Sequence, residues 1–181
     1  MAFTLANKIT VARIVGVPFF VSSLLYYSPG KEYIRWIAIG LFLGIVFTDA
    51  LDGYIARRFN QKTKVGAILD PLADKLLLIS SFIFLYALDD KFDISLPSWL
   101  VVCVISRDII LLLGALIIYM MHSNLDVKPI LIGKVTTFFQ MVSILCVLLN
   151  LPFAMLIWYI TFVLTLCSGV LYINQGIRLL H

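Results

Sequence analysis

Four aspartates in one short stretch of the sequence have the types and the spacing that metal-dependent chemistry requires. Asp49 and Asp52 stand three residues apart, and Asp70 and Asp74 stand four residues apart. On a helix, either spacing puts the two side chains on one face, one turn from each other. A short connection, 58–65, makes the two helices antiparallel neighbours, so that the two pairs can face each other.

Such a cluster needs a counter-charge, because close carboxylates repel one another and some stay protonated in a low-dielectric setting. A divalent cation resolves the conflict, and ligation by oxygen alone favours Mg2+, Mn2+ or Ca2+ over zinc. The plainer interpretation, helix-end charges solvated at a surface, fits an isolated pair better than two pairs that flank one loop. Gly53, Ala56 and Gly66 add a small surface that lets a ligand approach the backbone, and they suit helix packing equally well.

Three cations are candidates for binding a phosphate group: Lys75, Arg107 and Lys134. Arg107 lies well inside an apolar run, where an unpaired guanidinium is costly. Asp108 is its neighbour, but adjacent residues on a helix point away from each other, which argues against pairing. Arginine can bind a phosphate through two N–H groups at once, and lysine can bind it through a single positive charge.

These residues belong to a chain that is far more apolar than a soluble domain. Of its 181 residues, 62% are hydrophobic and 13% are charged, whereas a soluble domain is about 45–50% apolar and about 25% charged. Apolar runs of about 20 residues can cross a bilayer as helices. We therefore expect an all-α integral membrane protein, a single membrane-embedded catalytic domain over residues 1–181. Its six transmembrane helices are expected at about 10–27, 33–57, 66–88, 98–121, 131–149 and 153–175, after a surface helix or turn over residues 1–9.

The basic residues set the expected orientation in the membrane. One side collects Lys8, Arg13, Arg57, Arg58, Lys62, Lys64, Lys128 and Arg178, and the other holds Lys31, Arg35 and Lys91 beside several acids. The positive-inside rule then places both termini and the 58–65 loop in the cytoplasm. We expect a multi-pass protein of the cell membrane with its site facing the cytoplasm. The net charge of +4 suits an anionic membrane or substrate better than nucleic acid.

One motif in the chain is specific enough to name a family. Asp49-x-x-Asp52-Gly53-x-x-Ala56-Arg57, then eight residues, then Gly66-x-x-x-Asp70-x-x-x-Asp74 resembles the signature of the CDP-alcohol phosphatidyltransferases. Members of that family have six membrane helices, move a phosphatidyl group from a CDP-linked lipid to an alcohol, and release CMP. The resemblance implies CDP-diacylglycerol and a phosphate-bearing acceptor as substrates, membrane lipids as surroundings, and a homodimer.

The resemblance also implies roles for individual residues. Asp49, Asp52 and Asp70 would hold Mg2+ or Mn2+, and Asp74 would complete a second metal site and act as the catalytic base on the attacking hydroxyl. The CDP-lipid would contact Asn7, Thr10, Asp52, Gly53, Ala56, Arg57 and Gly66, and Arg13 belongs to the same first-helix segment. The acceptor phosphate would lie against Lys75, Arg107 and Lys134.

Two acceptors remain open within the family. The segments "NKITVARIVGVPFF", "DPLADKLL" and "GKVTTFFQM" resemble bacterial members whose acceptor is sn-glycerol 3-phosphate, and we expect that acceptor. Those members usually carry Ala-Arg-Glu in the fourth helix, often with a second arginine, whereas this chain has Ser106-Arg107-Asp108 and then apolar residues. "SRD" with "GKVTT" also resembles the CMP-forming cardiolipin synthases, whose acceptor is phosphatidylglycerol.

Two other classes of membrane protein fit the residues less well. Polyprenyl transferases of the aspartate-rich type also bind a metal-diphosphate between helices, but their chains are longer and lack the Asp-Gly-x-x-Ala-Arg core. A cation transporter needs carboxylates near the middle of the bilayer with water access from both sides. Here the acids gather at one edge, among cations suited to phosphate.

Overall fold

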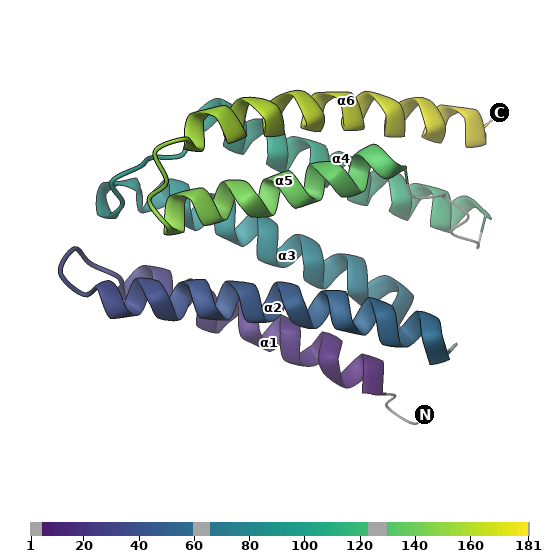
Figure 1. Cartoon of the computed structure of the whole chain (residues 1–181). Coiled ribbons are helices and arrows are strands. Elements are labelled where there is room, and N and C mark those ends of the chain that lie inside the picture. The colour runs from purple at the N-terminus through teal and green to yellow at the C-terminus, as the bar shows by residue number, and fades with distance from the viewer. Residues whose placement is uncertain (1–4, 60–65, 123–129, 181) are drawn as a thin grey trace. The chain divides into compact units, whose positions relative to one another are not determined.

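The computed structural model describes residues 5–59, 66–122 and 130–180, and side chains within 12–49, 75–114 and 130–175. These residues form helices and no strand (Figure 1). The elements in order are α1 (Leu5–Tyr26), α2 (Glu32–Phe59), α3 (Gly66–Ala87), the short 3-10 helix η1 (Asp89–Lys91), α4 (Ser98–His122), α5 (Leu131–Leu148) and α6 (Ala154–Leu180). The all-α prediction is confirmed, and each of the six ranges expected to cross the membrane is a helix.

The number of helices that cross a membrane is a separate question. Within the part of the chain that the structure describes, two helical segments are long and apolar enough to do so: Leu131–Leu148 and Ala154–Gln175. Two further apolar segments, Ala12–Tyr26 and Lys75–Ala87, are shorter. Six transmembrane helices therefore stay a prediction.

The chain divides into two compact units, Met1–Asp93 with α1 to α3 and Ile94–His181 with α4 to α6. In the first unit α1 packs against both α2 and α3. The rings of Phe20 and Phe42, both fully buried, lie 5.7 Å apart between α1 and α2. Gly16 permits this approach, since a Cβ there would lie 3.2 Å from the side chain of Ile45. The first unit is therefore a helix trio centred on α1.

The turn that follows α1 is closed by contacts with η1. Gly30 takes the left-handed conformation that the reversal into α2 requires, with φ of +98°. Tyr27 stacks on Phe92 with ring centroids 5.0 Å apart. The Nζ of Lys91 donates to the carbonyl oxygen of Leu25 at 2.8 Å, which satisfies one of the last carbonyls of α1.

In the second unit, α4 and α5 each pack against α6. Buried hydroxyls link α5 to α6 in place of a purely apolar seam. The hydroxyls of Ser143 and Thr161 lie 2.8 Å apart. The hydroxyl of Thr136 lies 2.8 Å from the carbonyl oxygen of Ile132 in its own helix and 3.1 Å from that of Leu164 on α6, so its one hydrogen is shared between them. Hydrogen bonds of this kind hold helices together where lipid tails remove the hydrophobic driving force.

A two-bond cap ends α5 and turns the chain into α6. The backbone N–H of Leu151 donates to the carbonyl of Cys146 at 2.9 Å, and that of Asn150 donates to Val147 at 3.1 Å. Asn150 has φ of 55°, a left-handed conformation that asparagine tolerates. This is the Schellman arrangement, and it makes α5 and α6 antiparallel neighbours.

Candidate functional site

The aspartate motif lies on two consecutive helices of the first unit. Asp49 and Asp52 belong to the C-terminal part of α2, and Asp70 and Asp74 belong to the N-terminal part of α3. The backbone is helical at all four, as predicted. The side chains at 50–74 and at 5–11 lie outside the described residues, which leaves Asn7, Thr10, Asp52, Gly53, Ala56, Arg57, Gly66, Asp70 and Asp74 without a described contact. That the four carboxylates meet stays a prediction.

Asp49 is the one motif aspartate whose side chain is described, and it is paired. Its Oδ1 forms an ion pair with Nη1 of Arg13, whose side chain is almost fully buried in α1. The pair joins α1 to α2 at the first residue of the motif. A cation held by the motif therefore has to share Asp49 with Arg13.

The chemistry of the donor set fits a hard divalent cation. Aspartates offer only oxygen, which Mg2+ and Mn2+ prefer over nitrogen or sulfur. Among the described side chains, no three His, Cys, Asp or Glu residues gather as a metal site. Three of the four motif aspartates are not among those side chains, so this finding leaves the predicted site untested.

Arg107 lies in the middle of α4 and is 6% exposed. Its Nη1 donates to Oδ1 of Asp108 at 2.7 Å, and its Nη2 donates to the Oγ of Ser168 on α6 at 2.6 Å. The expectation that Arg107 and Asp108 point away from each other is wrong. The long arginine side chain reaches back to its neighbour, because two buried charges are far less costly as a pair than alone.

Tyr172 on α6 contacts both α4 and the start of α5. The guanidinium carbon of Arg107 lies 5.8 Å from the centre of its ring, within the range of a cation–π contact. Its hydroxyl accepts a hydrogen bond from the backbone N–H of Ile130 at 3.3 Å, directly before α5 begins. Gly133 lies against the same ring, since a Cβ there would come within 2.6 Å of the Tyr172 hydroxyl.

The three predicted acceptor-site cations have different surroundings. Lys134 is exposed in the first turn of α5, one residue after Gly133. Arg107 reaches Tyr172 from α4. Lys75 is half-buried on α3, in the other compact unit. The second unit therefore places Arg107 against Tyr172, and Lys134 one residue after a glycine that lies against the same ring.

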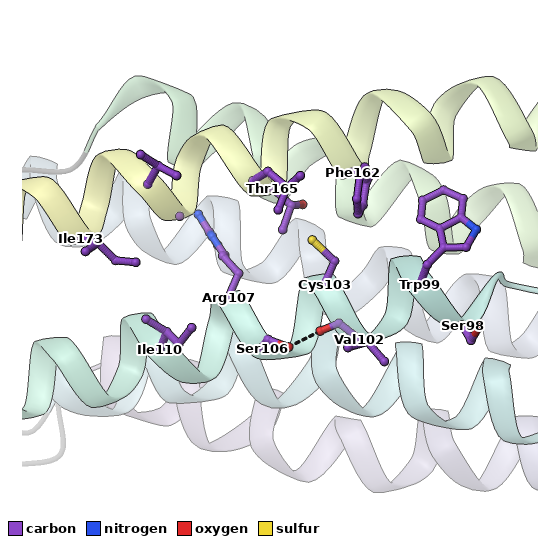
Figure 2. A pocket seen from close by; sticks show the side chains of 13 residues that line it. Ser98, Trp99, Val102, Cys103, Ser106, Arg107, Ile110, Phe162, Thr165 and Ile173 are labelled. Atoms are coloured by element: carbon purple, nitrogen blue, oxygen red, sulfur yellow. Dashed lines mark hydrogen bonds between the residues drawn. The ribbon is translucent and has the colours of Figure 1, made fainter.

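A pocket of about 640 Å3 lies between α4 and α6, with Arg107 as the one charged residue in its lining (Figure 2). Figure 2 shows Arg107 extending from α4 toward α6. Most of the lining is aliphatic or aromatic, and Trp99 and Phe162 meet edge to face with ring centroids 5.1 Å apart. The hydroxyl of Ser106 donates to the carbonyl of Val102, so it does not add a free polar group. Apart from Arg107, such a lining suits hydrocarbon better than a charged headgroup.

Sequence reasoning did not identify Ser168 and Tyr172. Both are polar residues in an apolar helix, four positions apart and so on one helix face. That spacing is a usable signal, because polar side chains within apolar helices usually face a partner helix or a site. The partner itself, 61 residues away for Ser168, could not be read from local spacing.

Comparison with known proteins finds a family model and several relatives whose names concern phosphatidyl transfer or phosphatidylglycerophosphate synthesis. A family model described as CDP-alcohol phosphatidyltransferase matches residues 3–167. A Bacillus subtilis protein named CDP-diacylglycerol–glycerol-3-phosphate 3-phosphatidyltransferase is 33% identical, over 96% of this chain and 95% of the relative. An Escherichia coli K12 protein of the same name is 32% identical, over 97% and 96%. A Mycobacterium tuberculosis H37Rv protein named probable phosphatidylglycerophosphate synthase is 33% identical, over 96% and 82%.

Proposed function

Since the chain belongs to the CDP-alcohol phosphatidyltransferase family, we propose that it transfers the phosphatidyl group of CDP-diacylglycerol to sn-glycerol 3-phosphate. The products are phosphatidylglycerophosphate and CMP. The observation that carries the proposal is the similarity to two relatives named for this reaction, which extends over 96% and 97% of the chain. The complete aspartate motif, from Asp49 to Asp74, supports the same donor chemistry.

On the donor side, we propose that Asp49, Asp52 and Asp70 hold Mg2+ or Mn2+ and that Asp74 completes a second ion's site. When bound, a divalent metal withdraws charge from a diphosphate and stabilises CMP as the leaving group. Asp74 takes the proton from the attacking hydroxyl. Asn7, Thr10, Gly53, Ala56, Arg57 and Gly66 contact the CDP-lipid. The buried Arg13 supports this arrangement by fixing Asp49, the first residue of the motif.

On the acceptor side, we propose that Lys75, Arg107 and Lys134 bind the phosphate of the acceptor. Nη1 and Nη2 of Arg107 donate hydrogen bonds to Asp108 and Ser168. Its Nε–H has no hydrogen-bond partner among the described residues. An arginine carries five N–H donors, so the bonds to Asp108 and Ser168 fix the guanidinium without using all of them. Lys134 adds an exposed charge in the first turn of α5, where the helix dipole also favours an anion.

We propose that all six helices cross the cell membrane and that the site faces the cytoplasm. Large apolar side chains are exposed on both units, among them Phe19, Phe47, Val102 and Leu156. Exposure of this extent marks a surface that contacts lipid or another protein. Membrane lipids cover most of it in this proposal, and a second copy of the chain covers the rest in a homodimer.

CMP release by the purified protein in detergent tests the reaction directly. The protein is incubated with CDP-diacylglycerol and Mg2+ or Mn2+, and glycerol 3-phosphate or phosphatidylglycerol is offered separately. We expect CMP release with glycerol 3-phosphate and its loss when EDTA replaces the metal. Release with phosphatidylglycerol alone would instead identify a cardiolipin synthase. The Ser106-Arg107-Asp108 segment also resembles that group of enzymes.

A further inference from the structure

We propose that Tyr172 is a positioning residue that holds Arg107 at a fixed place relative to the first turn of α5, where Lys134 lies. By fixing Arg107 relative to the turn that carries Lys134, Tyr172 sets the affinity for the acceptor phosphate. The inference rests on the proposed function, because it takes Arg107 and Lys134 as the acceptor-site cations. All the contacts that carry it lie within the second compact unit.

The first set of contacts fixes the guanidinium of Arg107 on α6. Its carbon lies 5.8 Å from the Tyr172 ring centre, and its Nη2 donates to Ser168 at 2.6 Å, one turn earlier on the same helix. Asp108, on α4 itself, accepts a hydrogen bond from Nη1 at 2.7 Å. The guanidinium is therefore held by three side chains, two of them on α6, and has little freedom to follow a ligand.

The second set of contacts joins the same tyrosine to α5. The Tyr172 hydroxyl accepts the N–H of Ile130 at 3.3 Å, one of the amides that an α-helix cannot satisfy within itself. Its ring lies so close to Gly133 that a Cβ would meet the hydroxyl oxygen at 2.6 Å. Gly133 therefore allows the start of α5 to pack directly on Tyr172, and Lys134 follows it in the chain.

One rigid side chain thus connects the elements that carry the two cations. A phosphate is bound most tightly when its donors are already in place, because less side-chain freedom is lost on binding. A tyrosine has only two side-chain torsions, so it transmits a fixed distance between α4 and α5. Shifting it moves Arg107 relative to Lys134 and weakens the phosphate site, whereas the donor site lies on other helices.

The first test removes the hydroxyl alone with Tyr172→Phe. The ring contact with Arg107 is kept and the bond to Ile130 is lost. We expect the KM for glycerol 3-phosphate to rise by at most about fivefold, the value of one ordinary hydrogen bond, because the lost bond holds the start of α5 and not the substrate itself. The kcat and the KM for CDP-diacylglycerol should stay at their wild-type values. Tyr159→Phe, an exposed tyrosine on the same helix, is the matched control.

The second test keeps the hydroxyl and displaces the ring with Gly133→Ala. The added methyl group needs the space of the Tyr172 hydroxyl, so this variant should also raise the KM for the acceptor and leave the KM for CDP-diacylglycerol unchanged. Gly40→Ala controls for the general effect of alanine in a helix, since nothing lies within 4 Å of the position its Cβ would take.

Thermal unfolding of each variant in detergent separates positioning from simple stability. If Tyr172→Phe lowers the unfolding temperature but leaves the KM for the acceptor unchanged, the inference is wrong and Tyr172 is only a packing residue. The KM comparison is made with whichever phosphate-bearing acceptor the wild type uses. If the proposed acceptor is wrong, the wild-type protein will already use a different one. If the positioning role of Tyr172 is wrong, only the KM values of the variants will show it.

Discussion

Each buried arginine with a described side chain lies against an aspartate. Arg13 pairs with Asp49, and Arg107 pairs with Asp108. A lone charge at membrane depth is costly, and removing one partner from a buried pair leaves that cost in full. The two pairs differ in their position, because Asp49 belongs to the proposed metal motif and is partly exposed, whereas Asp108 is completely buried.

Asp74→Asn should reduce kcat by at least about a hundredfold, because the amide can no longer take the proton of the attacking hydroxyl. Binding of CDP-diacylglycerol should be largely retained. Asp52→Asn should abolish turnover and the metal-dependent part of that binding as well. Both effects are measured by CMP release and by titration of the CDP-lipid with and without Mg2+.

Asp90→Asn is the control for these two variants, since Asp90 is an exposed carboxylate in η1, outside the motif. It should behave as the wild type. Wild-type turnover by both Asp52→Asn and Asp74→Asn would mean that the carboxylates do not carry the reaction.

Lys134→Ala should raise the KM for glycerol 3-phosphate by about tenfold or more, as expected for loss of a hydrogen bond between charged groups. The KM for CDP-diacylglycerol should change much less. Lys31→Ala, an exposed lysine in the turn before α2, supplies the comparison. An equal rise in both variants would point to a general electrostatic effect, and raising the salt concentration would reduce it.

The sequence predicts a site only from residues that are close together in the chain. The aspartate motif occupies 49–74, and its spacing alone indicates two helix faces and a metal. The surroundings of Arg107 could not be predicted in this way. Its partners on α6 are more than 60 residues away, and its bond to Asp108 depends on the reach of a long side chain rather than on helix geometry.

At the level of the helices, hydropathy predicted the right segments but not every end. All six expected ranges are helical, because each apolar run is bounded by polar or turn-forming residues. The start of the first helix and the end of the last differ most. α1 begins at Leu5, whereas its span was expected from residue 10, and α6 ends at Leu180, whereas its span was expected to end at 175. The polar residues before the apolar run do not interrupt a helix, so hydropathy locates the apolar segment and not the helix terminus.

The seam between α5 and α6 offers a test of polar packing. Gln140 is completely buried in α5, and neither atom of its amide has a hydrogen-bond partner among the described residues. A buried, unpaired amide costs about 1–3 kcal/mol. Gln140→Met keeps a similar length without polar atoms, so it should stabilise the protein by that amount. Thermal unfolding in detergent measures the change.

Ser143→Ala gives the opposite case on the same helix. Its hydroxyl is bonded across to Thr161, so its removal should destabilise the protein by about 1 kcal/mol. If Gln140→Met also destabilises, then the amide has a stabilising partner outside the described residues, and the unpaired amide is not a cost to the fold.

At the scale of the whole molecule, the proposed donor and acceptor residues are distributed over both compact units. The aspartate motif and Lys75 belong to the first unit, and Arg107 and Lys134 belong to the second. The family model matches residues 3–167 and so includes most of both. Neither unit contains the whole set of proposed site residues.

The proposed orientation predicts which turns a membrane-impermeant maleimide reaches in intact cells. Lys31→Cys, in the turn between α1 and α2, should react from outside. Gln61→Cys, between α2 and α3, should react only after the membrane is opened. The labelling is done in a chain whose native Cys103, Cys146 and Cys167 are replaced by alanine, since Cys167 is exposed on α6 and Cys103 is half-buried on α4. Labelling of Gln61→Cys from outside would show that the orientation is the opposite of the one proposed.

The pair formed by Arg107 and Asp108 restricts how the fourth helix can change by mutation. A first substitution at either position leaves the other charge buried without its partner. Such an intermediate is selected against, and descendants should either keep both charges or have exchanged both. A change at position 168 is restricted in the same way, since the Ser168 hydroxyl accepts a hydrogen bond from Arg107. Across related chains, positions 107, 108 and 168 should therefore vary together.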